Sequence, residues 1–169
     1  MATMATQSDA GSRSKTIANG ESVTRRLQQE LMQLMRESDP NATAFPDGDN
    51  LFSWTASITG ASGTVYEGLV FKLHISFPAN YPFTAPIVRF KTRCFHPNVS
   101  ENGDLCLDIL KERWSSTLTI GTILQSIRSL LADPNNDSPL NGLAAQLWNN
   151  QEEYKRVLLK KYHDDDMKK

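Results

Sequence analysis

Residues that suit acyl-transfer chemistry lie close together in the middle of the chain. Cys106 stands among leucines, and His96-Pro97-Asn98 precedes it by a short segment. A cysteine thiolate is a strong nucleophile, and a carboxamide N–H is a suitable donor to an oxyanion. Residues 96–110 therefore predict an acyl-transfer site, with Cys106 as the nucleophile and Asn98 as the donor.

The alternative for Cys106 is a buried cysteine that serves as a small apolar residue. Local features favour a nucleophile instead. Asn102-Gly103 indicates a turn, so that Cys106 follows a chain reversal. Asp104 and Asp108 alternate with leucines, which indicates a segment at the surface. Asn98 comes eight residues before Cys106, across the turn, and its carboxamide can fold back toward the sulfur.

Strong activation of the thiol, as in a cysteine hydrolase, is not indicated. Such a hydrolase needs an imidazole that takes the thiol proton. His96 is the only nearby histidine, and it lies beside Pro97 with no evident Asn or Asp to orient it. A modest nucleophile suits exchange between thioesters, where the attacking and leaving sulfurs are similar. Poor activation of water also protects a thioester from hydrolysis, so we expect thioester exchange at Cys106.

The composition fits one domain of ordinary size. The chain has 169 residues, of which 39% are hydrophobic, and a formal net charge of -1. It shows neither a long apolar run nor a block of basic residues, so neither a membrane nor a nucleic acid is an expected partner. Cys94 and Cys106 are the two cysteines, and no His/Cys cluster predicts a metal site. Nothing in the sequence argues for an oligomer, and we expect a monomer.

Both ends of the chain are expected to lie outside the folded domain. Residues 1–21 are rich in Ala, Ser and Thr and have no signal-peptide pattern. They predict a disordered tail and a protein of the cytoplasm and nucleus. Residues 164–169 are expected to form a short charged tail, which leaves residues 22–163 as the folded core.

The first predicted element is an amphipathic helix over residues 22–36, with Ser22 as its N-cap. Arg25 and Arg26 fall on its outer faces, where the simplest interpretation is a solvated surface. The predicted apolar stripe comprises Leu27, Leu31, Leu34 and Met35.

Strand patterns follow the helix. Residues 38–50 hold proline and glycine and predict a loop. Residues 52–58 and 65–77 alternate apolar and polar side chains, which predicts two strands, and residues 87–90 predict a short third strand. Because the connections are short, we expect an antiparallel meander.

The segment before the last strand, residues 77–86, contains three prolines and predicts a rigid loop. Its aromatic residues Tyr81 and Phe83 either plug the edge of the core or stand out as a contact for a partner.

Downstream of the cysteine the apolar period becomes helical. One helix is predicted from Ile120 to Asp133-Pro134, which ends it. Pro139 is expected to open a second helix and Asn150 to cap a third. One helix, a meander and further helices indicate an α+β domain. The buried stripe of the third helix is expected to comprise Tyr154, Val157, Leu158 and Tyr162.

The segment around the cysteine resembles the active-site signature of the ubiquitin-conjugating enzymes, the E2 family. The resemblance implies the E2 (UBC) fold, with an N-terminal helix, a four-stranded antiparallel meander sheet and C-terminal helices. No insertion lies between Cys106 and Trp114, which favours ubiquitin over SUMO as the modifier. The signature consists of His96-Pro97-Asn98, seven further residues and Cys106-Leu107-Asp108-Ile109-Leu110, and the wider resemblance runs from about Arg25 to Tyr162.

Within the family, the chain resembles the subtype that serves the anaphase-promoting complex, and the N-terminal tail also fits that subtype. This resemblance implies a role in protein degradation during the cell cycle. The segments that carry it are residues 25–32, 44–46, 63–67, 111–114 and 137–141.

The family resemblance implies a role for each residue of the site. Cys106 would accept ubiquitin from the E1 activating enzyme as a thioester, and a lysine amine would then attack to form an isopeptide bond. Asn98 would stabilise the oxyanion or hold the active-site loop, whereas His96 and Pro97 would be structural. ATP is used upstream by E1, so no bound cofactor is expected.

The resemblance also implies two partner-binding regions. Arg25 and Arg26 would help to bind E1, which replaces the simpler interpretation of a solvated surface. Phe83 and the loop Trp114-Ser115-Ser116 would meet a RING-type E3, expected to be the anaphase-promoting complex, on a face shared with the first helix.

One position departs from the family's pattern. Many members place Asp directly before the proline that matches Pro139, whereas this chain has Ser138 there and Asp137 one step earlier. Asp137 would then assist lysine attack, or the substrate would supply an acidic neighbour. The alternative function is a non-catalytic ubiquitin-binding relative, against which the presence of Cys106 argues.

Overall fold

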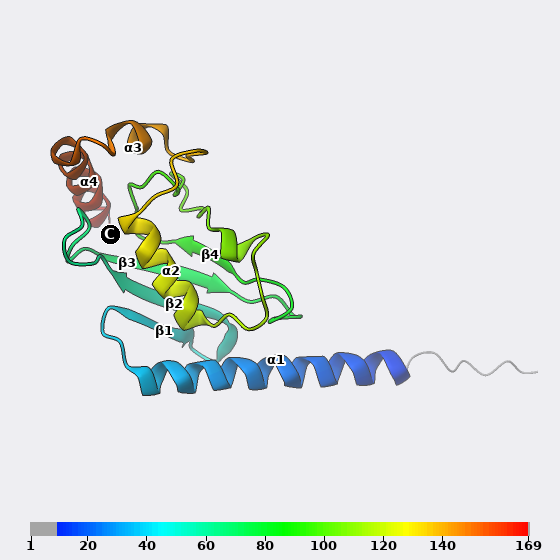
Figure 1. Ribbon diagram of the computed structural model, residues 1–169. Helices are drawn as coiled ribbons and strands as arrows, with labels where there is room; N and C mark the ends of the chain where they lie inside the picture. The colour runs from blue at the N-terminus through cyan, green and yellow to red at the C-terminus, as the bar shows by residue number, and fades with distance from the viewer. Residues whose placement is uncertain (1–9, 169) are drawn as a thin grey trace, which may run out of the picture.

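The computed structural model describes the backbone of residues 10–168 and the side chains of residues 20–168. One long helix comes first, the strands follow, and the chain ends in helices (Figure 1). The elements in order are α1 (Ala10–Glu37), β1 (Ala42–Asp47), β2 (Asn50–Thr59), β3 (Val70–Ser76), β4 (Ile87–Phe90), a 3-10 turn η1 (Asp108–Leu110), α2 (Ile120–Ala132), α3 (Gly142–Leu147) and α4 (Gln151–Asp166).

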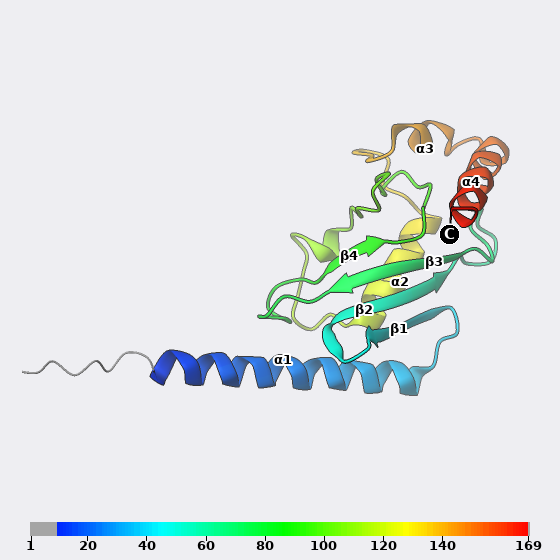
Figure 2. The same ribbon diagram turned by 180° about the vertical axis from the view of Figure 1, so that it is seen from behind.

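Across residues 10–168, the strands form one antiparallel sheet of four strands in the order β1-β2-β3-β4. Its register pairs Ala56 with Leu73, and His74 with Arg89. α2 crosses one face of the sheet, α1 runs beside β1, and α3 and α4 lie at the end remote from α1 (Figure 1). Figure 2 shows the other face of the sheet, which the described helices leave open. The predicted α+β fold, with its N-terminal helix, meander and C-terminal helices, is confirmed.

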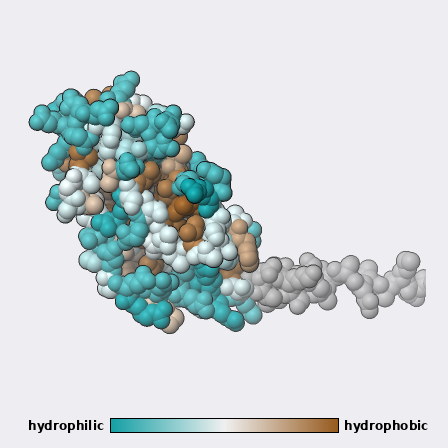
Figure 3. All heavy atoms as spheres, viewed as in Figure 1, coloured by the Kyte–Doolittle hydropathy of each residue, from teal (hydrophilic) through white to brown (hydrophobic). Residues whose placement is uncertain are grey.

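The core lies between α2 and the covered face of the sheet. Side chains on β2 and β3 alternate between buried and more exposed, as the two-residue period predicts. On the surface seen in Figure 3, polar residues cover the two ends of the molecule and apolar residues gather in the middle. The α2 residues buried in the core are Ile120, Ile123, Leu124, Ile127 and Leu131.

The prediction of a loop over residues 38–50 is wrong for Ala42–Asp47, which form the strand β1. Proline lacks the amide donor of a strand ladder, which is why the pattern indicates a loop. However, β1 is an edge strand, and Pro46 lies beside a register shift in its pairing with β2. Edge strands tolerate proline at such positions, so β1 supplies the fourth strand that the family resemblance implied.

The strand predicted over residues 65–77 begins later than expected, at Val70. Gly63 and Gly68 have φ angles of 79° and 76°, a left-handed conformation that glycine adopts without steric penalty. The chain therefore turns through residues 61–69 and enters β3 only after this turn.

Two buried tyrosines connect this turn to α4 and to the segment that leads to the site. The hydroxyl of Tyr66 donates to the Phe95 carbonyl at 2.6 Å, and the hydroxyl of Tyr154 donates to the same oxygen at 2.9 Å. The two hydroxyls also contact each other. Since Phe95 directly precedes His96, these bonds fix the start of the active-site segment.

Helix α1 begins at Ala10, before the predicted start, so Ser22 is an interior residue and not the N-cap. The apolar period that predicts a helix starts only near residue 22, and the preceding residues extend the helix beyond the sheet (Figure 1). Residues 1–9 of the expected tail lie outside the described residues, and α4 runs on through Asp166. The division into a tail, a core over residues 22–163 and a charged C-terminal tail stays a prediction.

The buried side of α1 also differs from the predicted stripe. Val23, Leu27 and Glu30 are buried, whereas Met35 is 64% exposed. A glutamate therefore occupies a core-facing position that the apolar pattern does not mark. None of the described helices is long and apolar enough to cross a membrane.

Helix α3 begins later than predicted. Pro139 does not open it, because Asn141 is the N-cap and accepts a hydrogen bond from the amide of Ala144 at 3.1 Å. The amides of Leu140 and Asn141 instead donate to the Pro97 carbonyl, at 2.8 and 3.1 Å. The segment before α3 is therefore bonded to the active-site segment.

Candidate active site

Cys106 follows the turn that Asn102-Gly103 predicts. The amide of Ser100 donates to the Asp104 carbonyl at 2.9 Å and closes the turn. The amide of Cys106 donates to the Asn98 carbonyl at 3.0 Å, so the two segments lie side by side, as their spacing predicts. The thiol of Cys106 is partly exposed, which does not support the alternative of a buried apolar cysteine.

Gly103 allows this turn to approach β4. Its φ is +87°, and a Cβ at this position would lie 2.2 Å from the carbonyl oxygen of Phe90. We expect Gly103→Ala to lower the free energy of unfolding by about 2–4 kcal/mol, from left-handed strain and this overlap. Gly63→Ala is the matched control, because its φ is +79° with open space around it. Urea unfolding measures both, and equal losses would contradict a limiting approach at Gly103.

His96 is buried and uses both ring nitrogens inside the protein. Nδ1 accepts a hydrogen bond from the amide of Asn98 at 3.0 Å, and Nε2 lies 2.8 Å from the carbonyl oxygen of Leu130. Since a carbonyl only accepts, Nε2 carries the proton. Burial lowers the pKa of His96 to about 4. This geometry fits a structural role and leaves no nitrogen to take a proton from Cys106.

The buried His96 predicts an acid-sensitive fold. Its pKa of about 4 lies below the ordinary value of 6.5, so between these values the unfolded chain binds a proton that the folded chain does not. The stability is fully present above pH 6.5 and falls by about 3 kcal/mol as the pH approaches 4. Urea unfolding between pH 7 and 4.5 measures this loss, and an equal pH dependence in His96→Gln would assign it to other groups.

Asn98 is buried, and its carboxamide forms two hydrogen bonds to the backbone of Asn135. Nδ2 donates to the Asn135 carbonyl at 2.6 Å, and Oδ1 accepts from the Asn135 amide at 2.8 Å. Both bonds go to the backbone. They support the second of the two roles considered for Asn98, which is to hold the active-site loop.

The held loop carries the acidic candidate. Oδ1 of Asn135 accepts a hydrogen bond from the amide of Asp137 at 3.0 Å, and the loop then reaches the bonds between Pro97 and residues 140–141. Asp137 and Ser138 are both exposed on this loop. The loop is therefore fastened to residues 97 and 98 on either side of the position where the family pattern has an aspartate.

Lys111 is a residue of the site that the sequence analysis missed. Its ammonium nitrogen lies 3.7 Å from the sulfur of Cys106. The 3-10 turn η1 returns the chain toward the cysteine and brings this side chain back. The ammonium is placed to donate a hydrogen bond to the sulfur that attacks or leaves in an acyl transfer. The sequence signal for Lys111 is its place five residues after Cys106, directly after the short segment Asp108-Ile109-Leu110.

Comparison with known proteins identifies the family of this chain. The sequence family described as ubiquitin-conjugating enzyme matches residues 26–162. The chain is 50% identical over 163 residues to the "Ubiquitin-conjugating enzyme E2-20 kDa" of Schizosaccharomyces pombe, which covers 95% of this chain and 93% of that protein. The chain belongs to the ubiquitin-conjugating enzyme family. It is an E2 enzyme, and its partners are ubiquitin, an E1 and an E3.

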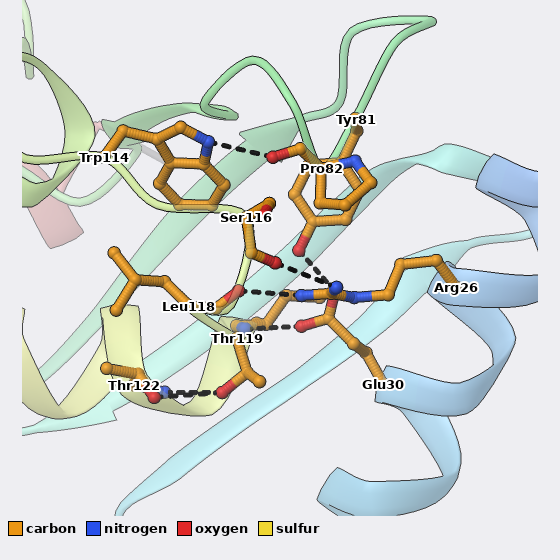
Figure 4. Close-up of polar contacts among 10 residues, drawn as sticks. Arg26, Glu30, Tyr81, Pro82, Trp114, Ser116, Leu118, Thr119 and Thr122 are labelled. Atoms are coloured by element: carbon orange, nitrogen blue, oxygen red, sulfur yellow. Dashed lines mark hydrogen bonds and ion pairs between the residues drawn. The ribbon is translucent and has the colours of Figure 1, made fainter.

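The proline-rich loop of this E2 places its two aromatic residues differently. Tyr81 is buried, whereas the side chain of Phe83 is 79% exposed. Tyr81 thus plugs the core, as the first predicted alternative has it, and Phe83 stands out from the core. A partner contact at Phe83 stays a prediction. The indole of Trp114 donates to the Pro82 carbonyl at 2.9 Å, which joins this loop to residues 114–116 (Figure 4).

The two arginines of the first helix, Arg25 and Arg26, differ in their exposure and in their bonds. Arg25 is exposed, whereas the guanidinium of Arg26 is bonded to the loop after Trp114. E1 binding by these arginines stays a prediction. Among the described residues, no group of three or more His, Cys, Asp or Glu side chains is arranged to hold a metal ion.

Proposed function

We propose that this E2 carries ubiquitin as a thioester on Cys106 and transfers it to lysine side chains. In the first step the Cys106 thiolate attacks the carbonyl carbon of the E1-bound ubiquitin thioester, and the E1 cysteine leaves as a thiolate. In the second step a neutral lysine amine attacks the new thioester. An isopeptide bond forms, Cys106 leaves as a thiolate, and the proton of the amine passes to a base.

The observation that carries this proposal is the partly exposed sulfur of Cys106 beside the Lys111 ammonium, with no imidazole available to it. This arrangement supplies a nucleophile and a leaving group without a general base that activates water. It therefore favours exchange with sulfur and amine nucleophiles over hydrolysis.

The other site residues are proposed to serve the second step. Asn98 holds the loop that bears Asp137, and its carboxamide is the candidate donor to the oxyanion. Asp137 is the candidate carboxylate that attracts the lysine and acts as the base that receives its proton. His96 and Pro97 keep the segment in place through buried hydrogen bonds.

The proposed E3 is the anaphase-promoting complex, reached through Phe83 and the loop Trp114-Ser115-Ser116. The exposed ring of Phe83 and its connection to this loop through Trp114 support a contact surface there. The segments that resemble the subtype of this complex support the choice of E3. The resemblance also supports the proposals of a role in cell-cycle degradation, a location in cytoplasm and nucleus, and E1 binding through the first helix, where the exposed Arg25 is the candidate contact.

A charging and discharge assay tests the proposal. The protein is incubated with E1, ATP and ubiquitin, and a thiol-sensitive adduct is expected on a non-reducing gel. The charged protein is then chased with free lysine, alone, with the anaphase-promoting complex or with an unrelated RING E3. We expect the anaphase-promoting complex to accelerate discharge by at least about tenfold over no E3, and more than the unrelated RING does.

The assay separates the two levels of the proposal. Absence of any adduct would contradict the thioester function itself. Normal charging with acceleration by the unrelated RING only would leave the thioester function in place and remove the anaphase-promoting complex as the E3.

A further inference from the structure

We propose that Arg26 is a positioning residue for the E3-binding surface, and that its side chain acts through the loop after Trp114 and not by contact with E1. This inference rests on the proposed E3 surface of Phe83 and residues 114–116. It assigns to Arg26 a task different from that of its neighbour Arg25.

The guanidinium of Arg26 binds main-chain carbonyls of the loop that follows Trp114. Nη1 donates to the Ser116 carbonyl at 3.0 Å, and Nη2 donates to the Leu118 carbonyl at 2.9 Å (Figure 4). One side chain of α1 thus bonds to two carbonyls of the loop. The planar fork of an arginine supplies these donors in a fixed geometry, which the single ammonium of a lysine does not.

The third donor of Arg26 reaches a buried carboxylate. Nε lies 3.1 Å from Oε2 of Glu30, which is only 4% exposed. Oε1 of Glu30 accepts a hydrogen bond from the amide of Ile120 at 2.7 Å, at the start of α2. A carboxylate is favoured at a helix N-terminus. Arg26 therefore balances the charge of the residue that fixes the end of the loop.

The same pair anchors the proline-rich loop. The hydroxyl of Tyr81 donates to Oε2 of Glu30, and the guanidinium of Arg26 lies 5.6 Å from the centre of the Tyr81 ring. The next residue, Pro82, accepts the hydrogen bond from Trp114. The segments on both sides of the exposed Phe83 surface thus converge on Arg26 and Glu30, as Figure 4 shows.

Arg25 has a different environment, although it is the adjacent residue. Its side chain is exposed on α1, where it is free to meet a partner. Three of the five N–H donors of Arg26 are already bonded within the protein, and a partner that drew this side chain away would have to break those bonds. The exposed Arg25 is therefore the better candidate for direct binding.

The test compares Arg26→Ala, Arg26→Lys, Arg25→Ala and Phe83→Ala, with Arg36→Ala as the control for loss of an exposed arginine of α1. Three quantities are measured for each: the KM of E1 for this E2, the discharge of the charged E2 to free lysine alone, and the KM for the E3 in stimulated discharge. Thermal unfolding and hydrogen exchange of the amides of residues 115–119 are recorded alongside.

We expect Arg26→Ala to raise the KM for the E3 by about tenfold, with faster exchange of residues 115–119 and with the other two quantities within about twofold of wild type. Arg26→Lys should recover part of the loss. Arg25→Ala should raise the KM of E1 instead. A variant that is merely less folded lowers all activities together, so this split separates positioning from a loss of stability.

The inference is overturned if both Arg26 variants keep the wild-type KM for the E3 while Phe83→Ala raises it; the proposed function then survives. It is also overturned if Arg26→Ala impairs charging as strongly as Arg25→Ala, which would place Arg26 in contact with E1. If Phe83→Ala leaves every E3 parameter unchanged, the proposed E3 surface fails and the inference fails with it.

Discussion

Cys106→Ala should abolish ubiquitin charging completely. Cys106 is the partly exposed thiol at the end of the turn, with Lys111 at 3.7 Å, whereas Cys94 is buried. Burial raises the pKa of the Cys94 thiol, which holds it in its unreactive protonated form. No substitute nucleophile is therefore available, and the thiol-sensitive adduct should fall to background on a non-reducing gel.

Cys94→Ala provides the matched control for the loss of Cys106. It removes a thiol that we expect to be unreactive, so its charging should stay close to wild type. Cys106→Ser should charge slowly and form an oxyester that resists thiol reductants, because an alcohol is a weaker nucleophile than a thiol. A thiol-sensitive adduct that persists in Cys106→Ala and disappears in Cys94→Ala would reassign the nucleophile.

Asn98→Ala should slow discharge of charged Cys106 to lysine by about 10²-fold, the typical effect of removing one oxyanion donor. The change removes the carboxamide N–H and also the two bonds that fix Asn135. Asn98→Asp keeps the acceptor for the Asn135 amide but removes both donors, and it places a negative charge beside a developing oxyanion. Its rate should be no higher than that of the alanine variant. Single-turnover discharge at saturating lysine measures both.

The two roles of Asn98 are separated by a variant at its partner. Asn135→Ala keeps the backbone groups that bind Asn98 and removes only the side-chain acceptor for the Asp137 amide. If the effect of Asn98 arises through the placement of Asp137 on the loop, Asn135→Ala should slow discharge to a similar extent, because it removes the bond to the Asp137 amide. If the oxyanion donor dominates, Asn135→Ala should stay within about tenfold of wild type. A rate within twofold of wild type for Asn98→Ala would remove Asn98 from the chemistry.

The parts of the fold that follow one strong period could be predicted from the sequence. The apolar period over residues 120–131 matches α2, and Asn150 caps α4 as predicted, accepting from the Glu153 amide at 3.3 Å. The pattern misses β1, because Pro46 is acceptable only on an edge strand, and edge position depends on the whole sheet. Local patterns do not contain that information.

In the site too, relations between residues close in the sequence could be predicted, and relations between distant residues could not. Short-range spacing predicts the turn before Cys106 and the nearness of the Asn98 backbone, and the structure confirms both through the Ser100–Asp104 and Cys106–Asn98 bonds. The grip of Asn98 on residue 135 and the bond from Glu30 to Ile120 join positions far apart in the chain. A period analysis treats Glu30 as a solvated residue, because the helix end that its carboxylate binds lies 90 residues away in the chain.

The bonds from Asn98 to Asn135 have a consequence for how the loop over residues 135–141 changes during evolution. Asn98 and Pro97 bond to the main-chain atoms of residues 135, 140 and 141, and every amino acid except proline supplies these groups. The side chains between these points can therefore be exchanged without loss of the clamp. Acidic and hydroxyl residues at 137 and 138 can shift by one position, as they do here, and selectivity for acceptor lysines can diverge on an unaltered frame.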